Sequence, residues 1–364
     1  MKQFFLFILL AVTCSSLFAT VRTVSNSPFT LAQFNTIQAA VDASNNNDTV
    51  YVHGSPNAYT AFTVTNKKLT VIGPGWSPNK NLPFSAIVPG IIITGASASG
   101  TEIQGLVITS TLDMNTSHPD NLRIIRNYFT GGQTIYMGQG SVTYIGYLFE
   151  GNVFDNNQIL ATAGSTYQNF LFQNNYFYET GCCIGASIQG FVNSVNVLIN
   201  HNLFFGTATN VRDVFAQNCR FLTITNNVFV RKDAGNQNSF STFNNNVTFY
   251  PAGSSSVPAD PWTLNSNINS GGNVSNQDPQ MTAQTSANAG TNNALADYSI
   301  AAGPANNTGS DGKDMGLLYD AVGSLNWANS RASRLPYVFS MNITNPTIPQ
   351  GGTINVQVEA RKNN

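Results

Sequence analysis

One stretch of this chain holds several charged residues whose types could do chemistry together. Charged residues make up only 9% of the 364, yet positions 201–233 hold a His, three Arg, a Lys and two Asp. A Lys or His side chain can act as a general base while an Arg neutralises a neighbouring carboxylate, which is the chemistry of β-elimination on a uronic acid. The candidate catalytic residues are His201, Arg212, Asp213, Arg231 and Lys232.

A repeat surrounds these residues and must position them. Between positions 122 and 230 one phrase recurs five times: two apolar residues separated by one position, then an Asn, then a Phe two positions later. The steps between successive Asn residues are 25, 23, 27 and 25 positions. A unit of this length cannot bury its own apolar face, and an apolar period of two indicates strands. We therefore expect stacked parallel β coils, one turn per repeat. The repeated positions are Asn127, Asn152, Asn175, Asn202 and Asn227, with Phe129, Phe154, Phe177, Phe204 and Phe229.

The repeated Asn and Phe residues have a structural reason to exist. In a parallel stack, equivalent residues of neighbouring coils lie about 4.8 Å apart. Asn side chains at that spacing can hydrogen-bond along the column, and Asn tolerates the left-handed backbone of a bend. Phe rings at that spacing can stack inside the core. We therefore interpret both columns as parts of the fold and not as ligand-binding sites.

The phrase resembles the repeat of right-handed parallel β-helix proteins, the pectin-lyase-like superfamily. Two further stretches are similar to parts of that family: Phe34–Ala43 to its amphipathic N-terminal cap, and positions 278–316 to the closing segment of bacterial members. The resemblance implies an all-β, right-handed parallel β-helix solenoid over 20–320 with an N-terminal cap helix. Alternation at Tyr337–Ile343 and Thr353–Val358 predicts a short C-terminal β-hairpin, so we expect 321–364 to be capping strands or a tail.

The resemblance leaves the activity open, because this fold hosts lyases, hydrolases, esterases, phage tailspikes and adhesins. The paired-carboxylate runs of polygalacturonase-like members are absent from the sequence, as are the motif segments of the methylesterase-like and pectate-lyase-like members. His201 lies one position before its Asn and Arg231 four after its own, so the charged candidates need not share a face. Glu150, Asp155 and Glu179 are isolated acids at turns, which we expect to be solvated.

These observations favour an exported, non-catalytic β-helix, an adhesin-like surface protein or one that contacts glycans. The alternative is a divergent polysaccharide lyase acting on uronic-acid-containing polysaccharide. No cofactor is expected, and Ca²⁺ would enter only under the lyase alternative. Asp311 and Asp314 lie in a Gly-rich turn, but two carboxylates are too few for a calcium site, and a capping turn is the better interpretation.

A second strand that recurs in each coil supplies candidate binding residues. If Ile135 and Val214 point into the core, the residues that follow them, Tyr136 and Phe215, point outward. Exposed aromatic rings could stack on sugar rings; a loop that covers them is the alternative. The net charge of −1 gives no case for a nucleic-acid partner, whereas a polar and nearly uncharged surface suits polysaccharides or cell-surface glycans.

The first 19 residues have the pattern of a bacterial signal peptide. Lys2 precedes the apolar run Phe4–Val12, and cleavage near Ala19 would leave a secreted, extracellular or cell-surface protein. Cys14 raises a lipoprotein alternative, which the residues before it disfavour. No later stretch reaches transmembrane length. Cys182, Cys183 and Cys219 fit no metal site, and we expect small buried residues, with a bridge from Cys219 to one of the pair left open.

Overall fold

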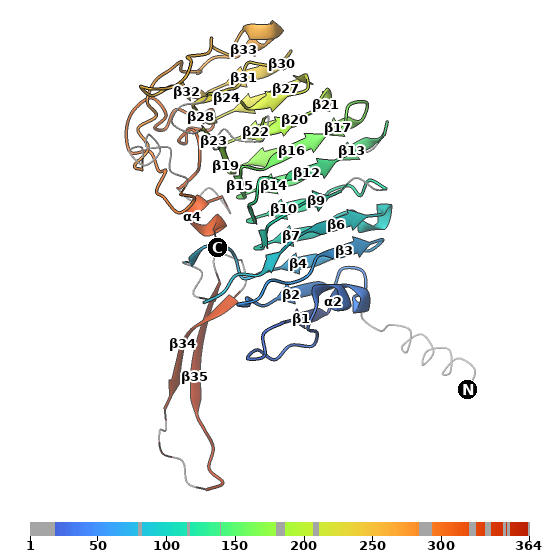
Figure 1. Cartoon of the computed structure of the whole chain (residues 1–364). Coiled ribbons are helices and arrows are strands. Elements are labelled where there is room, and N and C mark those ends of the chain that lie inside the picture. Colours follow the sequence, from blue (N-terminus) through green and yellow to red (C-terminus); the bar gives the residue numbers. More distant parts are fainter. Residues whose placement is uncertain are drawn as a thin grey trace, which may run out of the picture.

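The computed structural model describes residues 19–78, 82–114, 117–138, 140–179, 186–206, 211–283, 293–319, 325–331, 336–344, 347 and 350–362. Across these residues the chain is mostly β and winds into a parallel β-solenoid of about nine turns (Figure 1). The prediction of stacked parallel β coils is confirmed.

Three parallel sheets form the walls of the solenoid. The first sheet contains β1 (Val21–Val24), β2 (Thr49–Val52), β4 (Thr70–Ile72), β7 (Glu102–Gln104), β10 (Arg123–Ile125), β14 (Leu148–Glu150), β18 (Leu171–Gln173), β22 (Val197–Asn200), β27 (Leu222–Thr225), β31 (Thr242–Asn244) and β33 (Ile268–Asn269). The second sheet contains β5 (Ile87–Val88), β8 (Val107–Ile108), β11 (Tyr128–Phe129), β15 (Val153–Asp155), β19 (Tyr176–Glu179), β23 (Leu203–Gly206), β28 (Val228–Val230) and β32 (Val247–Phe249). The third sheet contains β3 (Phe62–Thr65), β6 (Ile91–Thr94), β9 (Leu112–Asp113), β12 (Thr134–Met137), β16 (Gln158–Ala161), β20 (Ile188–Gln189) and β25 (Phe215–Ala216).

Shorter strands pair at the corners between these walls. Three of them, β13 (Thr143–Ile145), β17 (Thr166–Gln168) and β21 (Asn193–Val195), form one small parallel sheet. Two further pairs join β24 (Arg212–Asp213) to β29 (Lys232–Asp233), and β26 (Cys219–Arg220) to β30 (Asn238–Ser239). The charged candidates on β24 and β29 therefore lie at a corner and not on a broad sheet face.

The Asn ladder sets the register of the coils. From Asn152 onward, each ladder Asn accepts two hydrogen bonds at its Oδ1 atom from the Asn of the preceding coil, one from the backbone amide and one from Nδ2; between Asn152 and Asn175 both are 3.0 Å. Asn127 accepts one from the amide of Leu106. After the five clear copies of the phrase, the ladder continues through Asn246, which the weaker repeat at 239–249 predicts, to Asn273. Two residues further on, the Phe rings stack with centroids 4.5–5.1 Å apart. Both structural interpretations of the repeat are confirmed.

The predicted cap helix is present but shorter than the sequence suggested. Helix α2 (Ile37–Ala43) begins after Thr36, whose side chain accepts a hydrogen bond from the first helical turn. Its buried residues Ile37, Ala40 and Val41 pack on the first coils. The apolar face of the helix therefore closes the N-terminal end of the core, where an open solenoid would expose apolar side chains.

After the last coil the chain returns along the side of the solenoid, as Figure 1 shows. We call residues 304–319 and 325–331 the closing segment; it includes α4 (Trp327–Ser330). Its Thr308 carbonyl accepts a hydrogen bond from Asn245, and its Leu318 amide donates to Asn174, several coils nearer the N-terminus. The chain ends in an antiparallel hairpin of β34 (Pro336–Ile343) and β35 (Val356–Lys362), which confirms the predicted hairpin. In Figure 1 the hairpin extends away from the solenoid beside its first coils and does not cover β33.

The one described cysteine is a buried free thiol. Cys219 has no exposed surface, and its Sγ lies 3.3 Å from the Ala216 carbonyl oxygen. Burial raises the pKa of this thiol to about 12. Cys219 is therefore a small buried residue, as expected, and the bridge left open by the sequence is not formed. Cys182, Cys183, Cys14 and the predicted leader before Ala19 lie outside the described residues.

Candidate functional site

Three of the five candidate catalytic residues are brought together by the pairing of β24 with β29. Arg212 lies opposite Lys232, and Asp213 lies opposite Asp233. Asn236 donates a hydrogen bond of 3.0 Å to Asp213 Oδ2. We call Glu179, Arg212, Asp213, Lys232 and Asp233 the charged corner. The sequence cluster therefore corresponds in part to a real cluster in space.

Lys232 and Glu179 form the centre of the charged corner. The side chain of Lys232 has no exposed surface, and its Nζ donates a hydrogen bond to Oε2 of Glu179. The Glu179 side chain is 5% exposed. The two residues are separated by two strand spacings, about 10 Å. In the coil between them the position paired with Glu179 is Gly206, which has no side chain to intervene. The expectation that Glu179 is solvated is wrong, because Lys232 reaches its carboxylate from two coils away. It is wrong for Glu150 too, which is buried and accepts a hydrogen bond from Gln173.

Burial governs the electrostatics of this corner. Burial lowers the pKa of Lys232, against the raising effect of the Glu179 carboxylate. Burial also raises the pKa of Asp213, and the hydrogen bond from Asn236 opposes that shift. The Tyr250 hydroxyl donates to the Lys232 carbonyl oxygen at 3.2 Å, which fixes the backbone at the pair. The ammonium group is thus held inside the corner and does not point into a cleft.

The side chains of the other two catalytic candidates do not contact this pair. Arg231 is buried, and its Nε donates to the Ser254 hydroxyl at 3.3 Å. His201 precedes β23 and so lies at the edge where the strands of the second sheet begin, whereas Lys232 follows β28 at the edge where they end. Only 1% of the His201 side chain is exposed. Its Nε2 is 3.1 Å from Asp311 Oδ2 in the closing segment, and burial lowers the pKa of the ring despite this carboxylate. The structure therefore does not combine His201 with Lys232 in one site.

Of the two candidate binding residues, one is exposed and the other is buried. Tyr136 points outward, as predicted, with 37% of its surface exposed. Phe215 is completely buried, so the prediction of an outward ring is wrong. The inward column of the third sheet runs through Ile159, Ile188 and Phe215. Coil lengths vary between the ladder positions, so counting from Val214 placed Phe215 on the wrong face.

An exposed aromatic pair that the sequence predictions do not include lies at another corner. Phe221 and Phe240 immediately precede inner positions of the first sheet and are 53% and 47% exposed. Their rings are 5.7 Å apart between centroids and inclined by 25°. The register of the first sheet places them in one column, which we call the outer-turn column, consisting of Gly100, Asn121, Gly146, Asn169, Asn196, Phe221, Phe240 and Ser266.

Every residue of the outer-turn column has a left-handed backbone, with φ between 52° and 79°. Gly and Asn tolerate this conformation, whereas for a bulky residue it is an outlier that costs roughly 1–2 kcal/mol. Phe221 and Phe240 therefore have a strained backbone conformation and exposed side chains. The sequence pattern could have indicated this pair. Each ladder Asn from Asn127 to Asn202 has Asn or Gly six positions upstream, whereas Asn227 and Asn246 have Phe221 and Phe240 there.

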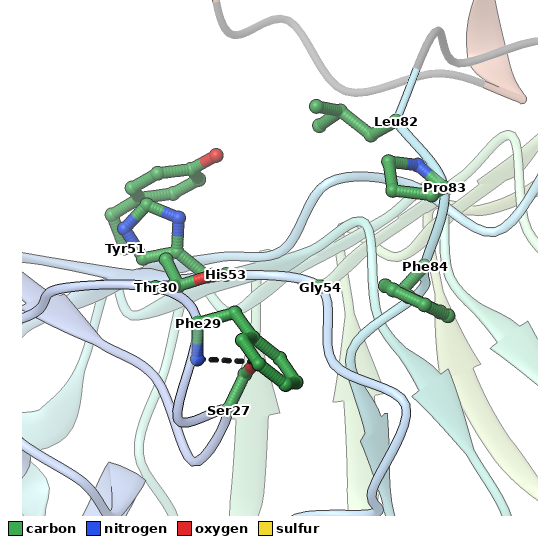
Figure 2. A pocket seen from close by; sticks show the side chains of 9 residues that line it. All are labelled: Ser27, Phe29, Thr30, Tyr51, His53, Gly54, Leu82, Pro83 and Phe84. Carbon is green, nitrogen blue, oxygen red and sulfur yellow. Dashed lines mark hydrogen bonds between the residues drawn. The ribbon is translucent and has the colours of Figure 1, made fainter.

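A small pocket lies beside the first coils. It has a volume of about 200 Å³, and Figure 2 shows the rings of Tyr51 and His53 on one side of it and Leu82, Pro83 and Phe84 on the other. Burial lowers the pKa of His53, and the two rings are 4.6 Å apart. None of the charged candidates contributes to this pocket, so it offers no support for elimination chemistry.

Metal and membrane signals are absent from the part of the chain that the structure describes. Within it, no group of three or more His, Cys, Asp and Glu side chains is placed to hold a metal ion. No described helix has the length and apolar character needed to cross a membrane.

No family model matches this chain, and no curated protein matches it. The parallel β-solenoid is thus established by the structure itself. Function must be inferred from the chain's own residues, because the fold hosts many activities.

Proposed function

We propose that this protein is an exported, right-handed β-helix of the pectin-lyase-like kind that binds glycans without cleaving them. The observation that carries this proposal is the closed pair of Lys232 and Glu179. A general base must reach the proton that it removes. Lys232 has no exposed surface and its ammonium group is already bonded, so a polysaccharide lying on the coils cannot contact it.

The remaining catalytic candidates support the same conclusion. His201 is covered by the closing segment and faces Asp311. Arg231 is buried against Ser254. Elimination requires a base and a group that neutralises the carboxylate on the same sugar unit. The exposed Arg212 could supply the second function. Beside it in the charged corner, the carboxylates of Asp213 and Asp233 are only partly exposed, and Asp213 Oδ2 already accepts a hydrogen bond from Asn236.

The outer surface suits a neutral, hydrogen-bonding partner. Exposed turns carry amide side chains; for example, Asn196 Nδ2 donates to Asn169 Oδ1 at 3.1 Å on the solvent side. Tyr136 adds an exposed ring on the third sheet. Together with the leader pattern at 1–19 and the net charge of −1, these features support a secreted or cell-surface protein whose partner is a polysaccharide or cell-surface glycan. No nucleic-acid partner and no cofactor form part of the proposal.

The experiment that tests this function combines a binding and a cleavage measurement. The purified chain without its leader is run through native gels that contain neutral or acidic polysaccharides, and the same mixtures are monitored by ultraviolet absorbance for unsaturated uronide ends, with and without Ca²⁺. We expect retarded migration with at least one glycan and no rise in absorbance. Turnover would refute the non-catalytic proposal, and unretarded migration with every glycan would refute glycan binding.

A divergent polysaccharide lyase acting on uronic-acid-containing polysaccharide is the second candidate. One observation favours it: Lys232, whose pKa is lowered by burial, lies opposite Arg212 on paired strands. A lowered pKa would make the amine a better base near neutral pH. Ca²⁺ would be needed only under this candidate. Turnover that disappears in Arg212→Ala and Lys232→Ala would establish it.

A further inference from the structure

The fold does not require Phe at positions 221 and 240. The six other residues of the outer-turn column are Asn, Gly or Ser, and all adopt the same left-handed backbone. Phe221 and Phe240 are each about half exposed, so the burial of their side chains stabilises the fold much less than that of a core Phe. Non-Gly residues held in a left-handed backbone conformation cluster at active sites and ligand-binding sites.

The two rings form one continuous apolar surface. They come from adjacent coils, and their centroids are 5.7 Å apart with planes inclined by 25°. Nearly parallel rings at this spacing are offset, so each leaves part of its face and an edge open to solvent. The spacing is also comparable with the length of one sugar unit in an extended glycan. A glycan lying along the solenoid axis could therefore place successive units over successive rings.

The surroundings of the rings favour a sugar over other apolar ligands. Asn196 precedes the pair in the column and Ser266 follows it, and both are exposed. A pyranose presents an apolar C–H face bordered by hydroxyl groups, which matches apolar rings bordered by amide and hydroxyl side chains. Two rings are too small for a stable protein interface, which buries roughly 800 Å² on each partner.

The charge around the pair favours neutral sugars. Arg220 is the only charged residue between positions 214 and 230 of the sequence. The outward neighbours on the first sheet, Thr223 and Thr242, are uncharged. A uronic-acid chain would carry one carboxylate for each sugar unit, and a single guanidinium could neutralise only one of them.

We infer that Phe221 and Phe240 form a stacking platform for a chain of neutral pyranose sugars that runs parallel to the solenoid axis. The inference rests on the proposed function, since it specifies where the glycan is held and of which class it is. The platform is a binding site and takes no part in covalent chemistry.

The test measures the binding of hexasaccharides by titration calorimetry. The neutral probes are cello-, manno- and chitohexaose, and the acidic probe is hexagalacturonate. Phe221→Asn/Phe240→Asn places at both positions the residue found elsewhere in the column, so the coils retain a compatible turn. We expect this variant to lose at least about tenfold in affinity for the neutral probe that binds wild type best. Phe29→Ser, which removes another exposed ring, should leave affinity unchanged.

A second variant protects the test against nonspecific effects of substitution. Phe221→Trp keeps an aromatic platform and should retain affinity, with a change in tryptophan fluorescence when the neutral hexasaccharide is added. Unchanged affinity in the double Asn variant would overturn the platform while leaving glycan binding by the wild type in place. Failure of the wild type to bind any probe would overturn both proposals. Preference for hexagalacturonate that is lost in Arg220→Gln would overturn the neutral class.

Discussion

Replacement of Lys232 by Met tests whether the charged corner is structural. Met keeps an unbranched apolar stem of similar length but removes the ammonium group, so the carboxylate of Glu179 is left without its ionic partner. That side chain is only 5% exposed. Breaking a buried ion pair from one side costs roughly 3–5 kcal/mol. We therefore expect Lys232→Met to lower the free energy of unfolding by an amount in this range.

The double variant Lys232→Met/Glu179→Met makes the prediction sharper. Replacing both partners of a buried pair by apolar residues of similar volume is often neutral or stabilising. The double variant should therefore unfold within about 1 kcal/mol of wild type, a much smaller loss than the single change produces. The matched control is Arg212→Met on the paired strand, where the side chain is exposed and the expected change is within about 0.5 kcal/mol.

Urea unfolding followed by circular dichroism measures these differences, and native gels with glycan measure binding by the same proteins. We expect the double variant to bind glycan as wild type does, because the Lys232 side chain is fully buried and the Glu179 side chain is nearly so. The reasoning is refuted if Lys232→Met is no less stable than Arg212→Met, or if the double variant is as unstable as the single one. A folded double variant that has lost a measured lyase activity would instead favour the catalytic candidate.

Three further predictions concern the turns and the ladder. Because burial lowers the pKa of His201 below 6.5, the unfolded chain binds a proton that the folded chain resists, so stability falls as pH drops below 6.5 towards the folded-state pKa. Urea unfolding at neutral pH and near pH 5 measures this loss of stability, and His201→Asn should make the loss smaller. An equal loss in wild type and variant would contradict the statement that His201 causes it. Asn175→Ala removes the acceptor of two buried Asn152 donors. It should lower the free energy of unfolding, measured with urea, by roughly 2–4 kcal/mol. A loss under about 1 kcal/mol would contradict a stabilising role for the Asn ladder. The free energy of unfolding of Phe221→Asn/Phe240→Asn should lie within about 1 kcal/mol of the wild-type value. Relief of roughly 1–2 kcal/mol of backbone strain per residue offsets the lost burial and stacking of the rings. A much larger loss of stability would show that the rings stabilise the fold.

The coils could be predicted from the sequence because one side chain in every coil fixes the register. The ladder Asn needs a neighbour at a fixed offset, so the pattern survives steps that vary from 19 positions, between Asn227 and Asn246, to 27, between Asn175 and Asn202. The added or missing residues lie at the other corners. The third sheet has no such fixed side chain, so the sequence alone does not show that Phe215, and not Val214, continues the inward column of Ile159 and Ile188.

The charged corner could be predicted only in part, for a different physical reason. Proximity in sequence correctly brought Arg212, Asp213 and Lys232 together, since their strands are in adjacent coils. The decisive partner, Glu179, lies 53 positions away along the chain from Lys232. It is reached only because the intervening coil has Gly206 at the paired position. Comparison of neighbouring repeats in the sequence does not predict a contact between long side chains that are two coils apart.

Two left-handed columns show why function is expected at one corner and not at another. The column next to the Asn ladder contains Asn174, His201 and Asn226, and the closing segment covers all three through hydrogen bonds to Leu318, Asp311 and Ser310. Substitution there must satisfy a covering chain. The outer-turn column has the same backbone conformation, but its residues from Asn169 to Ser266 face solvent. Where folding accepts Asn, Gly or Ser equally, the appearance of two adjacent, exposed and strained Phe residues has no evident benefit to the fold itself, and a ligand that contacts the rings supplies one.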